Sequence, residues 1–409
     1  MSRYWPLICL ALTHTLVDTC ALLVAPLWPM LERKFSLGMA GLSLAFVVHA
    51  LPTAFSQAAF GYLRDRRATP IWIWLGPVLA ATFLTLIGIA PSEAVLYALL
   101  IAGGIGVGAF HPEAAVTAGR LLPEQRTRSL SLFMFGGALG LALGPTLSGA
   151  IVDRWGLHAL AYLALPIILL VLLLRRAGNL AEATTPVSKK GETRSIGEMM
   201  QGRGRLAVGI LVLSSLRLVP NMGMDKVIAF TLEQQGHDVR QIGLYQTLFL
   251  VSASVGMFAM VFAFRAGWEK GFLVGCPLVG IPLLYLLGNT SSPSWLFAGS
   301  LALSGLVLWG TTPAMVSYAQ QLFPAGAGLA SAITMGLSWG IGGLIQAPLT
   351  AYFQSTGHPQ LALHAFIPCL AVAAIGCCFL PKISEMPLES APVLQTPRSS
   401  PACPDVGEA

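Results

Sequence analysis

Twelve long apolar segments recur along the chain, and they limit its possible folds more than any other feature. A helix needs about 20 mostly apolar residues to cross a bilayer core of about 30 Å. Because the segments lack strand-like alternation, they predict helices, which satisfy their own backbone hydrogen bonds in lipid. Only 10% of the residues are charged, against about 25% in soluble domains. The sequence therefore predicts an all-α integral membrane protein with helices near residues 5–30, 41–63, 71–90, 94–118, 130–152, 157–174, 206–232, 242–264, 272–287, 295–322, 328–353 and 361–381.

The positions of the basic residues predict how these helices are oriented. The formal charge of +6 would suit a nucleic-acid partner only if the basic residues were clustered. Instead, of the 24 Lys and Arg residues, eighteen fall on one side of the expected membrane and four on the other. Because cytoplasmic loops carry the excess of Lys and Arg, both termini are expected in the cytoplasm. We therefore predict a multi-pass protein of the cell inner membrane, with lipid and not nucleic acid as its surroundings.

A weak internal repeat divides the twelve helices into two halves. Pro112 and Pro313 lie 201 residues apart, as do Arg64 and Arg265, and the pairs Gly136/Gly336 and Gly140/Gly340 lie 200 apart. Several such pairs on equivalent helices indicate a duplication, which is common where one bundle rocks against another. We predict two pseudo-symmetric six-helix bundles at 1–174 and 206–381, a cytoplasmic linker at 175–205 and a disordered cytoplasmic tail at 382–409.

Two motifs resemble those of a known transporter family. The sequence Gly61-Tyr-Leu-Arg-Asp65-Arg66 looks like the GxLxDR signature of the major facilitator superfamily. Gly140-Leu-Ala-Leu-Gly144-Pro145 is similar to the GxxxGP motif of that superfamily's antiporters. The resemblance implies the twelve-helix major facilitator fold. It also implies that Asp65, at the cytoplasmic rim, braces one conformation against a helix that begins near residue 328.

A narrower resemblance points to drug efflux. His14-Thr-Leu-Val-Asp18, Phe110-His111-Pro112-Glu113 and the segment 319–324 resemble the fosmidomycin-resistance branch of drug efflux proteins. The expected role of Gly140, Gly144 and Pro145 is tight, kinked packing between the halves that limits leak. The alternative, ordinary packing of small residues, explains the two glycines but explains Pro145 less well.

His14 and Asp18 are the first candidates for proton coupling. Their spacing of four places both on one face of a helix, within hydrogen-bond reach. A charged group at the centre of the bilayer costs at least about 2.5 to 3.5 kcal/mol, so its presence suggests a function. Burial and a neighbouring imidazole together allow such a pair to exchange a proton near neutral pH. The alternative is a structural pair that ties the first helix to a neighbour.

Further candidates lie in the fourth and seventh helices. His111 and Glu113 are about 200° apart on a helix, so we expect one of them to face the path, and we favour Glu113. Arg217 suits either an anionic substrate or a fixed protein carboxylate such as Asp18 or Glu113. Pro220, Asn221 and Gly223 predict a broken helix nearby. Asp225 and Lys226 lie further out and are expected to form an interfacial or gating pair.

The function expected from these features is secondary active transport. We predict proton-coupled efflux of a small amphipathic or anionic compound by alternating access. Proton-coupled uptake of an organic acid and a non-transporting receptor of the same fold are the alternatives. The absence of GxxxxGK[ST], of nucleophile motifs, and of metal-ligand or CxxC spacings predicts no ATP use, no enzyme activity, no cofactor and no metal. The protein is expected to act as a monomer.

Overall fold

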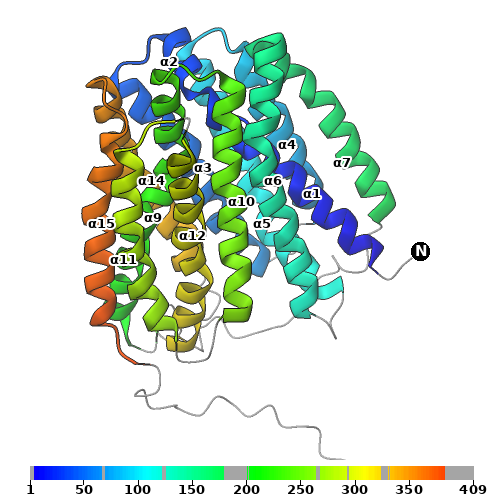
Figure 1. Cartoon of the computed structure of the whole chain (residues 1–409). Coiled ribbons are helices and arrows are strands. Elements are labelled where there is room, and N and C mark those ends of the chain that lie inside the picture. Colours follow the sequence, from blue (N-terminus) through cyan, green and yellow to red (C-terminus); the bar gives the residue numbers. More distant parts are fainter. Residues whose placement is uncertain are drawn as a thin grey trace, which may run out of the picture.

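The chain folds into a bundle of long helices, as a computed structural model shows (Figure 1). The described residues are 4–66, 70–121, 126–178, 200, 202–263, 268–292, 294–323, 330 and 332–382, and they contain no strand. The predicted linker and tail lie largely outside these residues, so the predicted domain boundaries stay predictions.

The first half of the chain supplies six long helices and several short ones. The short elements η1, α2, η2 and η4 connect the long helices at one end of the bundle. The elements are α1 (Trp5–Leu22), η1 (Ala25–Leu27), α2 (Trp28–Phe35), α3 (Met39–Arg66), α4 (Trp72–Leu86), η2 (Ile87–Ile89), α5 (Glu93–Leu121), α6 (Arg126–Trp155), η4 (Leu157–Leu163) and α7 (Ala164–Gly178).

The second half of the chain also supplies six long helices. Its elements are α9 (Gly204–Gln234), α10 (Val239–Ala263), α11 (Glu269–Gly288), α12 (Trp295–Leu322), the π-helical turn η6 (Ala332–Leu337), α14 (Ser338–Ser355) and α15 (Leu361–Cys378). The expected break in α9 is absent, because the helix runs continuously through Pro220. Proline removes only the hydrogen bond to the carbonyl of Leu216, and packed neighbours let a membrane helix tolerate that loss.

Eleven stretches of the described chain are long and apolar enough to cross a membrane. The twelfth expected helix is α14, which the turn η6 precedes and which packs against α9 and α3. Gln346, Thr350 and Gln354 lower its mean hydropathy, and the side chains of Gln346 and Thr350 are buried and hydrogen-bonded to each other at 3.0 Å. A helix that faces protein instead of lipid can carry such residues, so α14 completes the twelve-helix fold.

The two halves pack in the same way. In the first bundle α1 packs on α6, α3 on α5, and α4 on both α5 and α7. In the second bundle the equivalent pairs are α9 with α14, α10 with α12, and α11 with α12 and α15. The bundles meet along two equivalent pairs, α3 with α14 and α6 with α10. This repeated arrangement is that of two pseudo-symmetric six-helix bundles.

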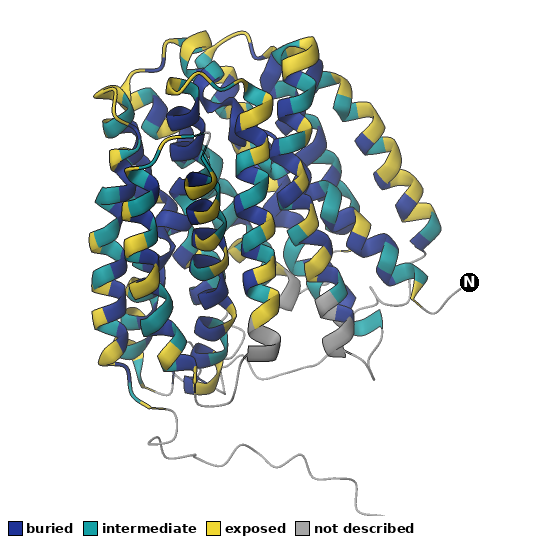
Figure 2. Ribbon diagram, viewed as in Figure 1, coloured by how far each residue is buried: buried dark blue, intermediate teal, exposed yellow. Residues whose placement is uncertain are grey.

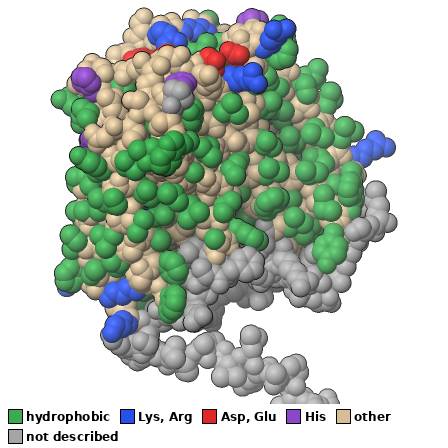
Figure 3. Space-filling model, in the orientation of Figure 1, with side chains coloured by type: hydrophobic (Ala, Val, Ile, Leu, Met, Phe, Trp, Pro, Cys, Tyr) green, Lys and Arg blue, Asp and Glu red, His purple; other side chains and the backbone are tan. Residues whose placement is uncertain are grey.

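The surface of the molecule is typical of a protein that lies in lipid. Buried residues face the interior of the bundles, whereas the outer faces of the helices are exposed (Figure 2). Apolar side chains cover the flank of the molecule, and charged side chains lie toward the ends of the helices (Figure 3). Large apolar side chains such as Leu165, Leu173 and Phe258 are more than half exposed. The exposed apolar belt therefore matches the hydrocarbon core of a bilayer.

At the end that carries α2, contacts hold the two bundles together. Arg33 of α2 forms an ion pair with Glu233 of α9, and Gln354 of α14 donates to Glu32 at 3.3 Å. Deeper in the bundle, the hydroxyls of Thr146 and Thr247 lie 2.7 Å apart and join α6 to α10. We call this the α2 end, and the bundles are closed against each other there.

Candidate functional site

His14 and Asp18 form a buried pair on one face of α1. Their side chains point toward each other, with 3.2 Å between Nε2 of His14 and Oδ2 of Asp18. The two residues are 2% and 7% exposed, so the carboxylate has little contact with solvent. The four-residue spacing thus brings the two side chains together on one face of the helix, as expected from the sequence.

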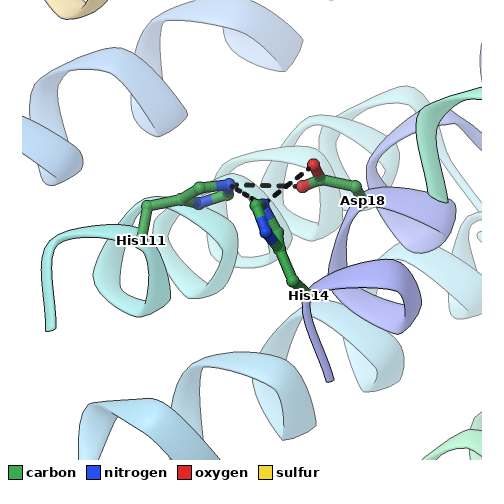
Figure 4. A group of neighbouring side chains, drawn as sticks. All are labelled: His14, Asp18 and His111. Carbon is green, nitrogen blue, oxygen red and sulfur yellow. Dashed lines mark hydrogen bonds and ion pairs between the residues drawn. The ribbon is translucent and has the colours of Figure 1, made fainter. Parts of the chain in front are cut away.

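His111 of α5 completes this group (Figure 4). Its Nε2 atom lies 3.2 Å from Nε2 of His14 and 3.3 Å from Oδ1 of Asp18. We call His14, Asp18 and His111 the histidine-aspartate cluster. Glu113, which was favoured from the sequence over His111 as the residue facing the path, is 2% exposed, and the ion-pair contacts of Asp18 come from the two histidines. The structure therefore brings His111 to the carboxylate.

Backbone carbonyls fix both imidazole rings of the cluster. Nδ1 of His14 lies 2.8 Å from the carbonyl of Phe133, and Nδ1 of His111 lies 2.8 Å from the carbonyl of Val107. A carbonyl oxygen only accepts hydrogen bonds, so each Nδ1 must carry a proton. In a neutral ring the Nε2 atom then presents a lone pair, and both lone pairs are directed into the cluster.

Gly137 of α6 makes room for the cluster, and it is not among the site residues predicted from the sequence. A Cβ atom at this position would contact the ring of His14 and lie 2.8 Å from Oδ2 of Asp18. Its neighbour Gly136 likewise lets α6 approach the carbonyl of Ala11. The Gly-Gly pair one turn before Gly140 was the available signal, but a sequence cannot show which helix faces such a pair.

The GxxxGP motif has two different packing roles. Gly140 and Gly144 face the carbonyls of Thr15 and Thr19, so they join α6 to α1 within one bundle and not between the halves. Pro145, in contrast, contacts the other bundle, because its carbonyl lies against Gly243 of α10. Whether this packing limits leak stays a prediction.

Arg217 of α9 is fully buried and has no carboxylate partner among the described residues. Its Nη1 atom donates to Thr311 and, at 3.3 Å, to the carbonyl of Leu308, both on α12. Its Nε and Nη2 atoms find no hydrogen-bond partner in the described part of the chain. Asn221, one turn further along α9, also leaves both its amide atoms without a partner there. Asp18 binds the two histidines instead, so it is not the fixed partner of Arg217.

Asp225 and Lys226 lie where α9 meets the first bundle. Nζ of Lys226 is 2.8 Å from Oδ1 of Asp225, and it lies 5.6 Å from the ring centre of Phe46. Lys226 is only 4% exposed, so Arg217 is not the sole buried cation in α9. Gln246 of α10 donates to the carbonyls of Asp225 and Ala25 at 2.6 and 3.0 Å, and thereby links the two bundles.

The signature at the other end of α3 is only partly visible. Gly61 faces Pro112 of α5, and a Cβ atom on it would lie 3.9 Å from the proline ring. Asp65 and Arg66 belong to the last turn of α3, but their side chains are outside the described part of the structure, as is residue 328. The bracing role of Asp65 therefore stays a prediction.

Several proteins with similar sequences or structures are named as transporters. The chain is 27% identical to the uncharacterised MFS-type transporter YfnC of Bacillus subtilis, over 90% of this chain and 91% of that protein. It is 26% identical to the fosmidomycin resistance protein of Escherichia coli, over 91% of both. Among solved structures, an inward-facing bacterial homologue of the lysosomal transporter Spinster has a TM-score of 0.71 at 16% identity. The alignment covers 92% of this chain and 96% of that one.

The nucleoside transporter NupG shares the same fold. Its crystal structure has a TM-score of 0.68 at 14% identity, covering 92% of this chain and 98% of that one. Residues 9–347 match the family described as the Major Facilitator Superfamily. This match spans both bundles, and the repeated helix packing described above agrees with it. The chain is a multi-pass membrane protein that belongs to the Major Facilitator Superfamily.

Proposed function

We propose that this protein is a proton-coupled efflux transporter for a small amphipathic or anionic compound. It works by alternating access in the cell inner membrane, as a monomer with both termini in the cytoplasm. The relative named for fosmidomycin resistance supports the preference for efflux. Protons would be carried at Asp18 with His14, and at Glu113.

One observation supports the proposal most directly. The two bundles bury ionisable side chains at equivalent places, an aspartate with two histidines in the first bundle and an arginine in the second. The first bundle holds the histidine-aspartate cluster between α1 and α5. The second bundle holds Arg217 between α9 and α12, the equivalent pair of helices. His111 and Thr312, which lies 3.5 Å from Arg217, are 201 residues apart, which is the spacing of the repeat. Buried ionisable groups in membrane helices typically mark a transport path.

The unpaired donors of the second bundle suit an anionic substrate. A guanidinium has five N–H donors, and a carboxylate or phosphonate can accept two of them side by side. The Nε and Nη2 atoms of Arg217, which have no hydrogen-bond partner among the described residues, supply such a pair, and the amide of Asn221 adds polar atoms one turn away. Substrate binding would thus satisfy groups that the described part of the chain leaves unsatisfied.

Proton-driven transport in vesicles tests the proposed function. Growth tests with a panel of anionic and amphipathic growth inhibitors first select candidate substrates. The purified protein is then reconstituted in proteoliposomes, and the selected compounds are added. If the protein is a proton-coupled efflux transporter, substrate and protons should cross the vesicle membrane in opposite directions. Movement of both in the same direction would favour the uptake of an organic acid. Binding without counterflow would favour the receptor and contradict the transport proposal.

Alternating access requires the two bundles to separate at the α2 end. We expect a disulfide between Thr146→Cys and Thr247→Cys to block transport, because these hydroxyls join α6 to α10 at 2.7 Å. Mass spectrometry identifies the cross-link, and transport is measured before and after reduction. Each single cysteine variant serves as the control and should transport at close to the normal rate. Full transport by the cross-linked protein would contradict opening at this end.

A further inference from the structure

We propose that the histidine-aspartate cluster is a binding site for a divalent transition-metal ion such as Zn²⁺. Two imidazoles and one carboxylate are ligands that Zn²⁺ prefers, and three protein ligands plus one exchangeable position form a common zinc geometry. His14, Asp18 and His111 offer one ligand atom each, all within 4.8 Å of one another.

The separations between the ligand atoms match a tetrahedral metal. Zinc–nitrogen and zinc–oxygen bonds of about 2.0 to 2.1 Å place neighbouring ligand atoms about 3.3 Å apart at tetrahedral angles. The Nε2 atoms of His14 and His111 are 3.2 Å apart, and their contacts with the carboxylate are 3.2 and 3.3 Å. These separations lie at or just beyond the long end of the range for a direct N–H···O hydrogen bond, about 2.7 to 3.2 Å. The spacing of the three side chains therefore fits ligands arranged around a metal ion.

The surroundings of the two histidines strengthen the inference. A histidine that binds a metal almost always donates its other ring N–H to a carbonyl or carboxylate, which fixes the ring. Here the carbonyls of Phe133 and Val107 accept from the two Nδ1 atoms, each at 2.8 Å. Two neutral rings held in this way direct two lone pairs at each other, which is unfavourable unless a proton or a metal ion lies between them.

Space and access at the cluster also suit an ion. Because residue 137 is a glycine, no Cβ fills the space beside Nε2 of His14 and Oδ2 of Asp18. The side chain of His111 is 21% exposed, so an ion can reach the cluster from the side of this ring, while Asp18 itself is buried. The fourth position would hold water or a group of a bound ligand.

Zinc binding to the purified full-length protein tests the site. Isothermal titration calorimetry in detergent should detect one Zn²⁺ per chain. Asp18→Asn and His111→Gln should each weaken binding at least about 100-fold, because each removes one of three ligands. His364→Gln is the matched control, since His364 pairs with Asn289 and lies outside the cluster. Mg²⁺, which prefers oxygen ligands and octahedral geometry, should not bind with comparable affinity.

A second measurement does not depend on how the variants fold. X-ray absorption of the wild-type protein with one equivalent of Zn²⁺ should show two imidazole nitrogens at about 2.0 to 2.1 Å. A spectrum without two imidazoles would overturn the proposal, as would binding that His111→Gln leaves unchanged.

A bound metal ion should also inhibit transport, because it occupies the carboxylate at which a proton would be carried. This consequence, unlike the binding itself, rests on the proposed function. We expect proton-driven export to fall in proportion to Zn²⁺ occupancy and to recover when a chelator is added. Undiminished export at full occupancy would overturn the inhibition. A chain that binds Zn²⁺ but shows no proton-driven transport would count against the proposed function alone.

Discussion

Asp18→Asn is expected to abolish uphill export while the protein stays folded in the membrane. Asparagine has nearly the same shape as aspartate and still accepts a hydrogen bond, but it cannot carry a proton. His14 and His111 would then lie beside a neutral amide instead of the carboxylate that each contacts at 3.2 and 3.3 Å. The measurement is substrate accumulation in inside-out vesicles with an imposed pH gradient. Accumulation should drop to the level of vesicles that lack the protein.

Two companion variants make this prediction specific. Glu113→Gln should have the same effect if the buried Glu113 carboxylate also carries a proton. Asp153→Asn makes the same chemical change at an exposed position of α6 and should leave export unchanged. Full pH-driven accumulation by Asp18→Asn or by Glu113→Gln would remove that residue from the mechanism.

Arg217→Met should abolish transport of an anionic substrate without lowering the thermal stability of the protein. A buried charge without a counter-ion is costly, and replacing it by an apolar side chain of similar size is often neutral or stabilising. Losing a buried charged contact with substrate costs about 2 to 5 kcal/mol, or roughly 30-fold to several thousand-fold in affinity. Substrate binding and the unfolding temperature in detergent are both measured.

The opposite result would assign Arg217 a structural role. A variant that unfolds at lower temperature yet binds substrate normally would show that the guanidinium holds α9 to α12 through Thr311 and Leu308. Arg217→Lys should bind substrate at an intermediate level, because it keeps the charge but loses the paired donors. Arg205→Met, at an exposed position in the first turn of the same helix, is the control for changes in charge.

The fold followed almost entirely from the spacing of apolar residues. Twenty-residue apolar stretches have few alternatives to a membrane helix, and eleven of them are found in the described chain. The twelfth, α14, corresponds to the apolar segment expected at 328–353, although its buried Gln346 makes it less apolar than the others. The break expected in α9 was wrong, because Pro220 and its neighbours are equally compatible with a continuous, packed helix.

The site was only half predictable, for a geometric reason. The pairing of His14 with Asp18 depends on helix periodicity alone, and a sequence reveals that periodicity. The position of His111 depends on the rotation of α5 against α1, which contacts between helices determine. The same limit applies to Arg217, since the absence of a carboxylate partner among the described residues is visible only when its neighbours are known. Gly137 could be noticed in the sequence, but the residues that it makes room for could not.

The hydrogen bond from His14 to the carbonyl of Phe133 connects the imidazole of the cluster directly to the backbone of α6. Phe133 lies in α6, and twelve residues further along the same helix Pro145 rests on Gly243 of the opposite bundle. At a rise of 1.5 Å per residue, the two points are about 18 Å apart along the axis. A movement of α6 at Phe133 would therefore also move the contact at Pro145, because both residues lie in one continuous helix.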